Sequence, residues 1–131
     1  MSGEQTVNLR IHSGVPIVDV LGEWLPNVTD ALSEMIRMLT ENGHYDIVVN
    51  VQKAALTGIV ALSSLSYAAR SVRMHCGHID VVGTRDQVSE LIHCKVERGF
   101  RYSVSEETAI GRIKRIPILA AAKGCTARPV A

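Results

Sequence analysis

The sequence predicts one α/β domain with a mostly parallel sheet of about five strands and four to five helices. Strand-like apolar segments alternate with amphipathic helical segments along the chain, which is typical of parallel strands joined by right-handed crossovers. The length agrees, because 131 residues suffice for one hydrophobic core and not for two. The pattern dissolves from residue 116, so we expect a domain over residues 1–115 and a loosely ordered tail over residues 116–131, unless the tail packs against a second subunit.

Composition is ordinary for a globular domain and argues against several classes of protein. Apolar residues make up 47% and charged residues 21%, and the formal net charge of +1 gives no reason to expect a nucleic-acid partner. No apolar stretch is long enough to span a bilayer and the N-terminus lacks a signal-peptide core, so we expect no direct membrane insertion and a cytoplasmic location. The cysteines Cys76, Cys94 and Cys125 are an odd number and far apart, so we expect a reducing compartment and no disulfide framework.

The first two strands are expected to form a hairpin. Residues 6–11 alternate between apolar and polar side chains, which indicates a half-buried strand. Residues 15–21 are apolar except for Asp19, which indicates a strand buried on both faces. Ser13 and Gly14 separate the two segments, so the first strand should run antiparallel to the second.

Two long amphipathic helices follow. The first has Asn27 as its candidate N-cap and ends at Asn42–Gly43. The second begins at Thr57–Gly58, after a buried strand over residues 47–51, and ends at Gly77. Apolar residues spaced three or four apart define the inner face of each helix. These residues are Val28, Ala31, Leu32, Met35, Ile36 and Leu39 on the first helix, and Ile59, Leu62, Leu65, Ala69 and Val72 on the second.

The last part of the chain supplies two strands and two helices. Residues 79–82 form a short strand, and Thr84 with Gln87 has the spacing of a capping box at the start of a short helix. Residues 101–104 are a candidate edge strand, and Ser105 is the candidate N-cap of the last helix. The inner face of the short helix is expected to carry Val88, Leu91 and Ile92.

Three strand-to-helix loops should carry the functional surface, because sites in open α/β sheets form at the carboxyl ends of the strands. These loops lie within residues 23–27, 52–58 and 83–86. The single tryptophan, Trp24, is either an interface anchor or a lid over the core, and Leu56 is either a docking knob or an inward-pointing side chain. The candidate partner-binding residues are Glu23, Trp24, Leu56, Thr57, Gly58 and Thr84.

Neither catalysis nor a cofactor is indicated. The residues of metal-ligand type that come in groups are His75, Cys76, His78, His93 and Cys94. One mixed triplet and a distant pair do not have the spacing of a four-ligand zinc site, so we expect no metal. The sequence has no nucleophile elbow, P-loop or dinucleotide fingerprint, and Glu106–Glu107 lie where the dipole of a helix alone favours acids. We therefore expect a protein that is not an enzyme and has no cofactor.

Four segments resemble a known family in their order and pattern. These segments are residues 17–23, residues 46–62, residues 79–83 and residues 88–110, with glycines at Gly22, Gly58 and Gly83. Together they resemble the STAS domain, the fold of bacterial anti-sigma-factor antagonists, over roughly Val7 to Ile113. The resemblance implies a docking module for a serine/threonine-kinase-type anti-sigma factor or another STAS protein, with a homodimer as a further option.

The signature loop of that family usually reads Asp-Ser-Ser-Gly followed by Leu, and a partner kinase phosphorylates the hydroxyl before the Gly. The corresponding segment here is Ala55-Leu56-Thr57-Gly58-Ile59. The resemblance therefore implies that Thr57 is the phosphorylation site, although Ala55 replaces the acid and Leu56 the first serine. A phosphate would add about −1.5 to −2 charges and oppose docking of a partner to an apolar loop. The alternative is a STAS subunit of a scaffold or transport complex that is not phosphorylated.

Overall fold

The computed structural model describes residues 7–24, 26–55, 58–93 and 100–122. Five strands form one sheet in the order β1-β2-β4-β6-β7, and the two short strands β3 and β5 form a second, parallel pair. Within the larger sheet β1 is antiparallel to β2 and the other pairs are parallel, which confirms the predicted fold class. The elements are β1 (Val7–His12), β2 (Val15–Val20), β3 (Gly22–Glu23), α1 (Pro26–Glu41), β4 (Asp46–Asn50), β5 (Ala54–Ala55), α2 (Gly58–Arg73), β6 (His78–Val82), α3 (Arg85–His93), β7 (Phe100–Ser103) and α4 (Glu106–Ala122).

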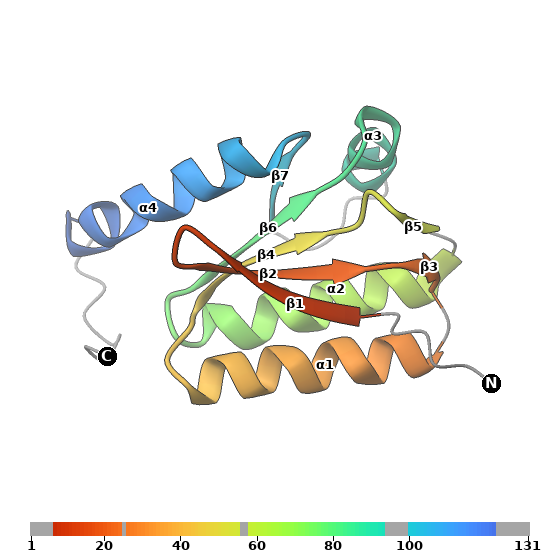
Figure 1. Ribbon diagram of the computed structural model, residues 1–131, viewed down its shortest axis with the longest axis horizontal. Helices are drawn as coiled ribbons and strands as arrows, with labels where there is room; N and C mark the ends of the chain where they lie inside the picture. The colour runs from red at the N-terminus through yellow and green to blue at the C-terminus, as the bar shows by residue number, and fades with distance from the viewer. Residues whose placement is uncertain (1–6, 25, 56–57, 94–99, 123–131) are drawn as a thin grey trace.

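The helices cover the sheet unequally. Helices α1 and α2 lie side by side on one face, and α4 lies on the other (Figure 1). Helix α3 and the β3–β5 pair lie at the end of the sheet toward which β2, β4 and β6 point (Figure 1). Helix α4 packs on β4, β6 and β7 and covers Val15 and Ile17 of β2, so β1 is the least covered strand of the sheet on that side.

The β1–β2 hairpin follows the prediction. His12 pairs with Val15, so the turn consists of Ser13 and Gly14 alone. Both residues have positive φ angles, 55° and 80°, which is the conformation of the two-residue turn that matches strand twist. Residues of β2 are buried on both faces except Asp19, which is partly exposed.

Helix α1 begins two residues earlier than predicted. Pro26 is its first residue, so Asn27 lies inside the first turn and the prediction of Asn27 as N-cap is wrong. Proline is favoured at this position because its missing N–H has no partner in the first turn and its φ angle is already helical. The helix ends as predicted at Gly43, whose φ angle is +85° and whose neighbour His44 donates its N–H to the Leu39 carbonyl.

Helix α2 ends at Arg73, and the turn that closes it reaches Gly77. Cys76, and not Gly77, adopts the left-handed conformation, with a φ angle of 59°. The N–H of Gly77 bonds to the Val72 carbonyl, so the helix closes in a Schellman motif with Cys76 at its left-handed position. Gly77 is required for space, because a Cβ atom there would lie 2.0 Å from the carbonyl oxygen of Tyr45. Cys76 is also disulfide-bonded, contrary to the expectation for the cysteines.

Two buried clusters form the core, one on each face of the sheet. The larger joins β2, β4 and β6 to α1 and α2, and includes Trp24 and Leu91. The predicted inner face of α1 is confirmed, and Leu65, Ala69 and Val72 of α2 are buried, whereas the side chains of Ile59 and Leu62 lie outside the described set. The smaller cluster lies under α4 and consists of Val15, Ile17, Val48, Val82, Ala109, Ile110 and Ile113.

The two last helices depart from the sequence pattern. Leu91 of α3 is buried as predicted, but Ile92 is 57% exposed, so its assignment to the inner face is wrong. Helix α4 has Ser105 as its N-cap, with the Thr108 N–H bonded to the Ser105 hydroxyl. It continues to Ala122, past residue 116 where the periodic pattern was expected to dissolve. Chain beyond residue 122 is outside the described part.

Candidate functional site

The three predicted loops meet at one end of the sheet. The parallel β3–β5 pair joins the first loop to the second, with Gly22 opposite Ala54 and Glu23 opposite Ala55. The Gly22 N–H also donates to the Lys53 carbonyl at 3.0 Å. The third loop is attached to the second through the Val51 N–H, which donates to the Val82 carbonyl at 2.8 Å. The sequence prediction that these loops share one edge is therefore confirmed, and it follows from the parallel strand directions.

Gln87 connects the third loop and α3 to the second loop through its side chain. Its amide nitrogen donates to the carbonyl oxygens of Val51 and Ala54, at 2.8 and 3.0 Å. Its amide oxygen accepts the N–H of Thr84 at 2.8 Å, and the Gln87 N–H donates to the Thr84 hydroxyl at 3.2 Å. The capping box predicted from the Thr84–Gln87 spacing is confirmed, and the two bonds to the second loop go beyond it.

The predicted partner-binding residues have different surroundings. Glu23 and Thr84 are exposed, and Gly58 is the first residue of α2. Trp24 is only 3% exposed and belongs to the larger core cluster, so of the two alternatives the structure selects core packing, and Trp24 offers little surface to a partner. Leu56 and Thr57 lie outside the described residues, directly between exposed Ala55 and the start of α2.

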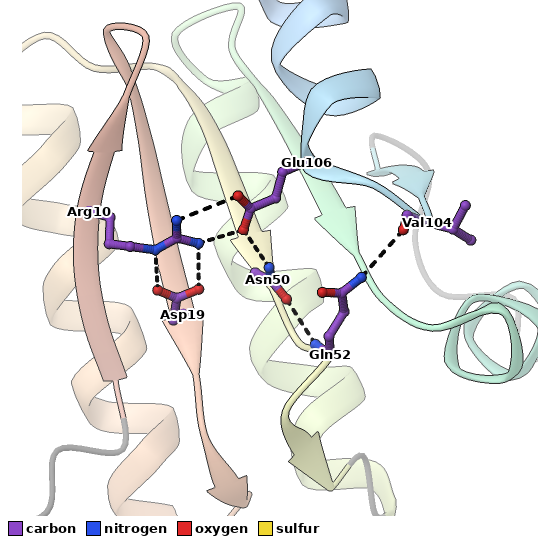
Figure 2. Close-up of polar contacts among 6 residues, drawn as sticks. All are labelled: Arg10, Asp19, Asn50, Gln52, Val104 and Glu106. Carbon is purple, nitrogen blue, oxygen red and sulfur yellow. Dashed lines mark hydrogen bonds and ion pairs between the residues drawn. The ribbon is translucent and has the colours of Figure 1, made fainter.

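A charged network lies beside these loops, between β1, β2, the end of β4 and the start of α4 (Figure 2). Arg10 donates to both carboxylate oxygens of Asp19, from Nε at 2.6 Å and from Nη2 at 2.9 Å. Its Nη1 and Nη2 also bond to Glu106, Nη1 at 3.5 Å. Asn50 donates from Nδ2 to Glu106 at 2.6 Å and accepts the Gln52 N–H at 2.9 Å. The network thus ties the β1–β2 hairpin and the end of β4 to the first residue of α4.

The charges in this network stabilise one another. The hydrogen bonds that Arg10 donates to Asp19 and Glu106 raise the pKa of its guanidinium. The bonds from Arg10 and then Asn50 lower the pKa of Glu106, against the effect of its partial burial. Because these bonds favour its charged form, Glu106 is not suited to exchange protons near neutral pH.

The network lines an open hollow of about 590 Å³ that reaches the second loop. Asp19 and Glu106 face Arg10 there, and Lys53 adds a second cation at the loop. The hollow is lined by Asn8, Arg10, Asp19, Val20, Leu21, Asn50, Gln52, Lys53 and Glu106. This network was not predicted from the sequence, where the helix dipole alone accounted for Glu106. The available signal was the pair of opposite charges, Arg10 and Asp19, on two adjacent strands that are otherwise mostly apolar.

A second ion pair holds α4 against β6. Asp80 is fully buried, and its Oδ1 accepts a hydrogen bond from Nη1 of Arg112 at 3.0 Å. The Arg112 Nη2 donates to the Tyr102 carbonyl at 3.1 Å, so one side chain bridges β6 and β7. Burial raises the pKa of Asp80, and Arg112 opposes that rise. This pair lies under α4 and serves packing rather than an exposed site.

Within the described ranges, no three His, Cys, Asp or Glu side chains gather as a metal-binding group. The ring of His75 instead stacks on Tyr45, with centroids 4.5 Å apart, and His78 lies 3.3 Å from Asp46. Of the helices that the structure describes, none combines the length and the apolar character needed to cross a membrane.

Comparison with known proteins identifies the fold. No protein-family model matches the chain, and no curated protein matches it in sequence. Among solved structures, an anti-sigma factor antagonist from Mycobacterium paratuberculosis is 20% identical with a TM-score of 0.67, covering 83% of this chain and 93% of that one. A Moorella thermoacetica RsbS variant is 12% identical with a TM-score of 0.72, covering 87% and 99%. The anti-sigma factor antagonist SpoIIAA in its unphosphorylated form is 14% identical with a TM-score of 0.66, covering 82% and 97%.

These similarities show that the chain has the STAS fold, as the sequence resemblance implied. The matched structures include proteins named as anti-sigma factor antagonists, which are regulators. SpoIIAA is also among the matches in its phosphorylated form, at 12% identity and a TM-score of 0.62.

Proposed function

We propose that this protein is a docking module of the anti-sigma-factor antagonist type, which regulates a partner by binding it. The observation that carries the proposal is the convergence of three loops at one end of the sheet, where Glu23, Ala55 and Thr84 are exposed and Thr57 follows Ala55 by two positions in the sequence. The likeness in fold to anti-sigma factor antagonists supports the same role. The proposed partner is a serine/threonine-kinase-type anti-sigma factor or another STAS protein, and the proposal assigns the chain no catalysis and no cofactor.

The docking surface in this proposal consists of Glu23, Leu56, Thr57, Gly58 and Thr84. Trp24 supports it from the core side, because it is buried directly after β3. Glu23 is the acid of the surface, and the β3–β5 register sets it opposite Ala55, the position where the family signature has its own acid. We therefore assign Glu23 the contact with a cationic group of the partner.

The proposed switch is phosphorylation of Thr57, which directly precedes the first residue of α2. A phosphate at this position would add about −1.5 to −2 charges at the N-terminus of a helix, where the helix dipole favours negative charge. The fold would therefore tolerate the modification, whereas a partner surface matched to Ala55 and Leu56 would lose its contact through bulk and desolvation.

Titration calorimetry with the kinase-type anti-sigma factor of the native host tests the proposal, followed by mass spectrometry after incubation with ATP. We expect binding by the unmodified protein, phosphate on Thr57, and loss of binding once it is modified. An unmodified Thr57 after prolonged incubation with a kinase that binds the protein would contradict the switch. No binding by either form would contradict the docking function.

A second candidate function rests on Ala55, which lacks the carboxylate of the family signature. In this alternative the chain is a STAS subunit of a scaffold or transport complex and is not phosphorylated.

A homodimer and a cytoplasmic location belong to the proposal in either case. The disulfide bond at Cys76 counts against a cytoplasmic location, because such bonds are rare in reducing compartments. Cell fractionation with an antibody to the protein would show in which compartment it lies.

A further inference from the structure

We infer that Gln87 is a positioning residue that holds residues 51–55, directly after β4, in the conformation they present to a partner. The inference rests on the proposed function for the meaning of that conformation, but the contacts that carry it are present in the protein alone. Gln87 belongs to α3, which follows α2 and β6 in the sequence, and its side chain still reaches the second loop.

The side chain of Gln87 is fully used in holding this junction. Both hydrogens of its amide nitrogen point to backbone carbonyls of the second loop, Val51 and Ala54, at 2.8 and 3.0 Å. Its amide oxygen accepts the Thr84 N–H at 2.8 Å. A neutral amide provides two donors and an acceptor at once, which neither a carboxylate nor an aliphatic side chain can do.

The two bonded carbonyls stand at the base of the docking surface. The Val51 carbonyl also accepts the N–H of Ala54 at 3.0 Å, so Gln87 closes the turn that leads into β5. Ala54 and Ala55 then pair with Gly22 and Glu23, and thus the first loop depends on the same turn. Without Gln87, the Val51 and Ala54 carbonyls would each lose one donor. The turn would then be held by the Ala54 N–H to Val51 carbonyl bond alone, and the β3–β5 pair that rests on it would be weakened.

The surroundings of Gln87 fix its side chain in this orientation. A Cβ atom on Gly83 would lie 3.0 Å from the Gln87 Oε1 and 3.2 Å from its Cβ, so Gly83 leaves room for the side chain to fold over the loop. The mutual bonds between Thr84 and Gln87 hold its backbone at the first turn of α3. The loop and the start of α3 therefore form one unit, in which Thr84 is placed beside the second loop.

Gln87→Glu separates the positioning role from the role of Gln87 in the helix cap. Glutamate keeps the oxygen that caps the Thr84 N–H, because either Glu or Gln can serve at this position of a capping box. It loses both donors and sets a carboxylate against the carbonyls of Val51 and Ala54. The matched control is Ser105→Ala, which removes the N-cap of α4, because the Ser105 hydroxyl bonds to Thr108 of the same helix.

Amide hydrogen exchange followed by NMR reads out the loop in the protein alone. We expect Gln87→Glu to speed exchange of the Ala54 and Gly22 amides by about tenfold or more, because their acceptors lie in this turn. The Val51 amide should change little, since its acceptor is the Val82 carbonyl of β6. Unchanged exchange at Ala54 and Gly22, or an equal increase in Ser105→Ala, would overturn the inference.

Partner affinity completes the test. A weaker complex of Gln87→Glu with the kinase-type anti-sigma factor, together with faster exchange, supports the inference. Faster exchange with unchanged affinity overturns its link to docking. If the unaltered protein does not bind that partner while exchange still responds, the positioning role is supported and the proposed function fails on its own.

Discussion

Gly77 shows how one residue fixes the spacing between the end of α2 and the strand β4. A Cβ atom at this position would meet the backbone of Tyr45 at 2.0 Å, and the neighbouring His78 N–H bonds to the same Tyr45 carbonyl. Backbone cannot retreat as a flexible side chain can. The glycine therefore serves the close approach of two segments, whereas the left-handed residue of the turn is Cys76.

Gly77→Ala should lower the free energy of unfolding by about 3 kcal/mol, because the new methyl group must displace the backbone of Tyr45. Urea denaturation measures the change. Gly111→Ala is the matched control, since its Cβ meets nothing within 4 Å on α4, and it should instead stabilise the helix by about 1 kcal/mol. Equal effects of the two substitutions would contradict the packing assigned to Gly77.

Glu106 should make stability depend on pH. Its pKa is lowered from an ordinary value of 4.5 by Arg10 and Asn50, so its contribution to stability is present above that value. The contribution is lost as pH falls through the lower pKa of the folded state. We expect Glu106→Gln to lower the free energy of unfolding by about 1 kcal/mol at pH 7. The difference should nearly vanish at acidic pH, where Glu106 itself is protonated.

Unfolding curves measured across this acidic range check the dependence on Glu106. Glu107→Gln removes the same charge from the same helical turn and tests for a simple dipole effect. If the two variants lose stability equally at pH 7, the network around Arg10 adds nothing to the dipole, and our account of Glu106 is incorrect.

At the scale of elements, α4 is attached to the sheet by a buried ion pair as well as by apolar packing. Arg112 joins Asp80 on β6 to the Tyr102 carbonyl on β7, beside the apolar cluster under the same helix. Such a pair contributes little by itself, but breaking it leaves a buried charge without its partner.

Arg112→Met should therefore destabilise the protein by about 3 kcal/mol at neutral pH. The loss should shrink in acid, because Asp80, whose pKa is already raised by burial, takes up a proton and no longer buries a charge. Arg37→Met removes an arginine paired only with exposed Glu34 and Glu41 and should leave stability nearly unchanged. Thermal unfolding at several pH values compares the stability of the two variants. If the destabilisation by Arg112→Met stays constant in acid, it does not come from a buried charge on Asp80.

The elements themselves were predictable where local chemistry decides them. Alternation and apolar runs predicted the five strands of the larger sheet, though not β3 and β5, and Thr84 with Gln87 predicted the start of α3. The polar network of Arg10, Asp19 and Glu106 was not predictable. In the sequence Arg10 lies 9 positions from Asp19 and 96 positions from Glu106, so their contact depends on strand register and on where α4 crosses the sheet. The exposure of Ile92 likewise depends on how little of short α3 packs on the core.

At the scale of the whole molecule, the sequence predicts which end of the sheet carries the candidate site, but not the contacts that hold the three loops together there. Parallel strand directions are enough to bring the three loops to one edge. The β3–β5 pair and the reach of Gln87 to Val51 and Ala54 require the folded backbone. Trp24 could not be placed for the same reason, since either side of that loop could have been the buried one.

The charge of Glu23 should matter for docking and not for folding, because its side chain is exposed opposite Ala55. We expect Glu23→Lys to weaken the complex with the kinase-type anti-sigma factor by about tenfold or more, with unfolding unchanged. Surface plasmon resonance provides the affinity. Glu41→Lys, on exposed surface at the far end of α1, makes the same charge change away from the loops and should bind normally. Equal affinities of the two variants would remove Glu23 from the docking surface.

The most direct test of the docking function is affinity capture from the native host with the unaltered protein and with Thr57→Glu, whose carboxylate imitates part of the charge of a phosphate. Our account predicts that the unaltered protein captures a serine/threonine-kinase-type anti-sigma factor or another STAS protein, and that Thr57→Glu does not. Capture of the same scaffold or transport subunits by both forms would contradict it.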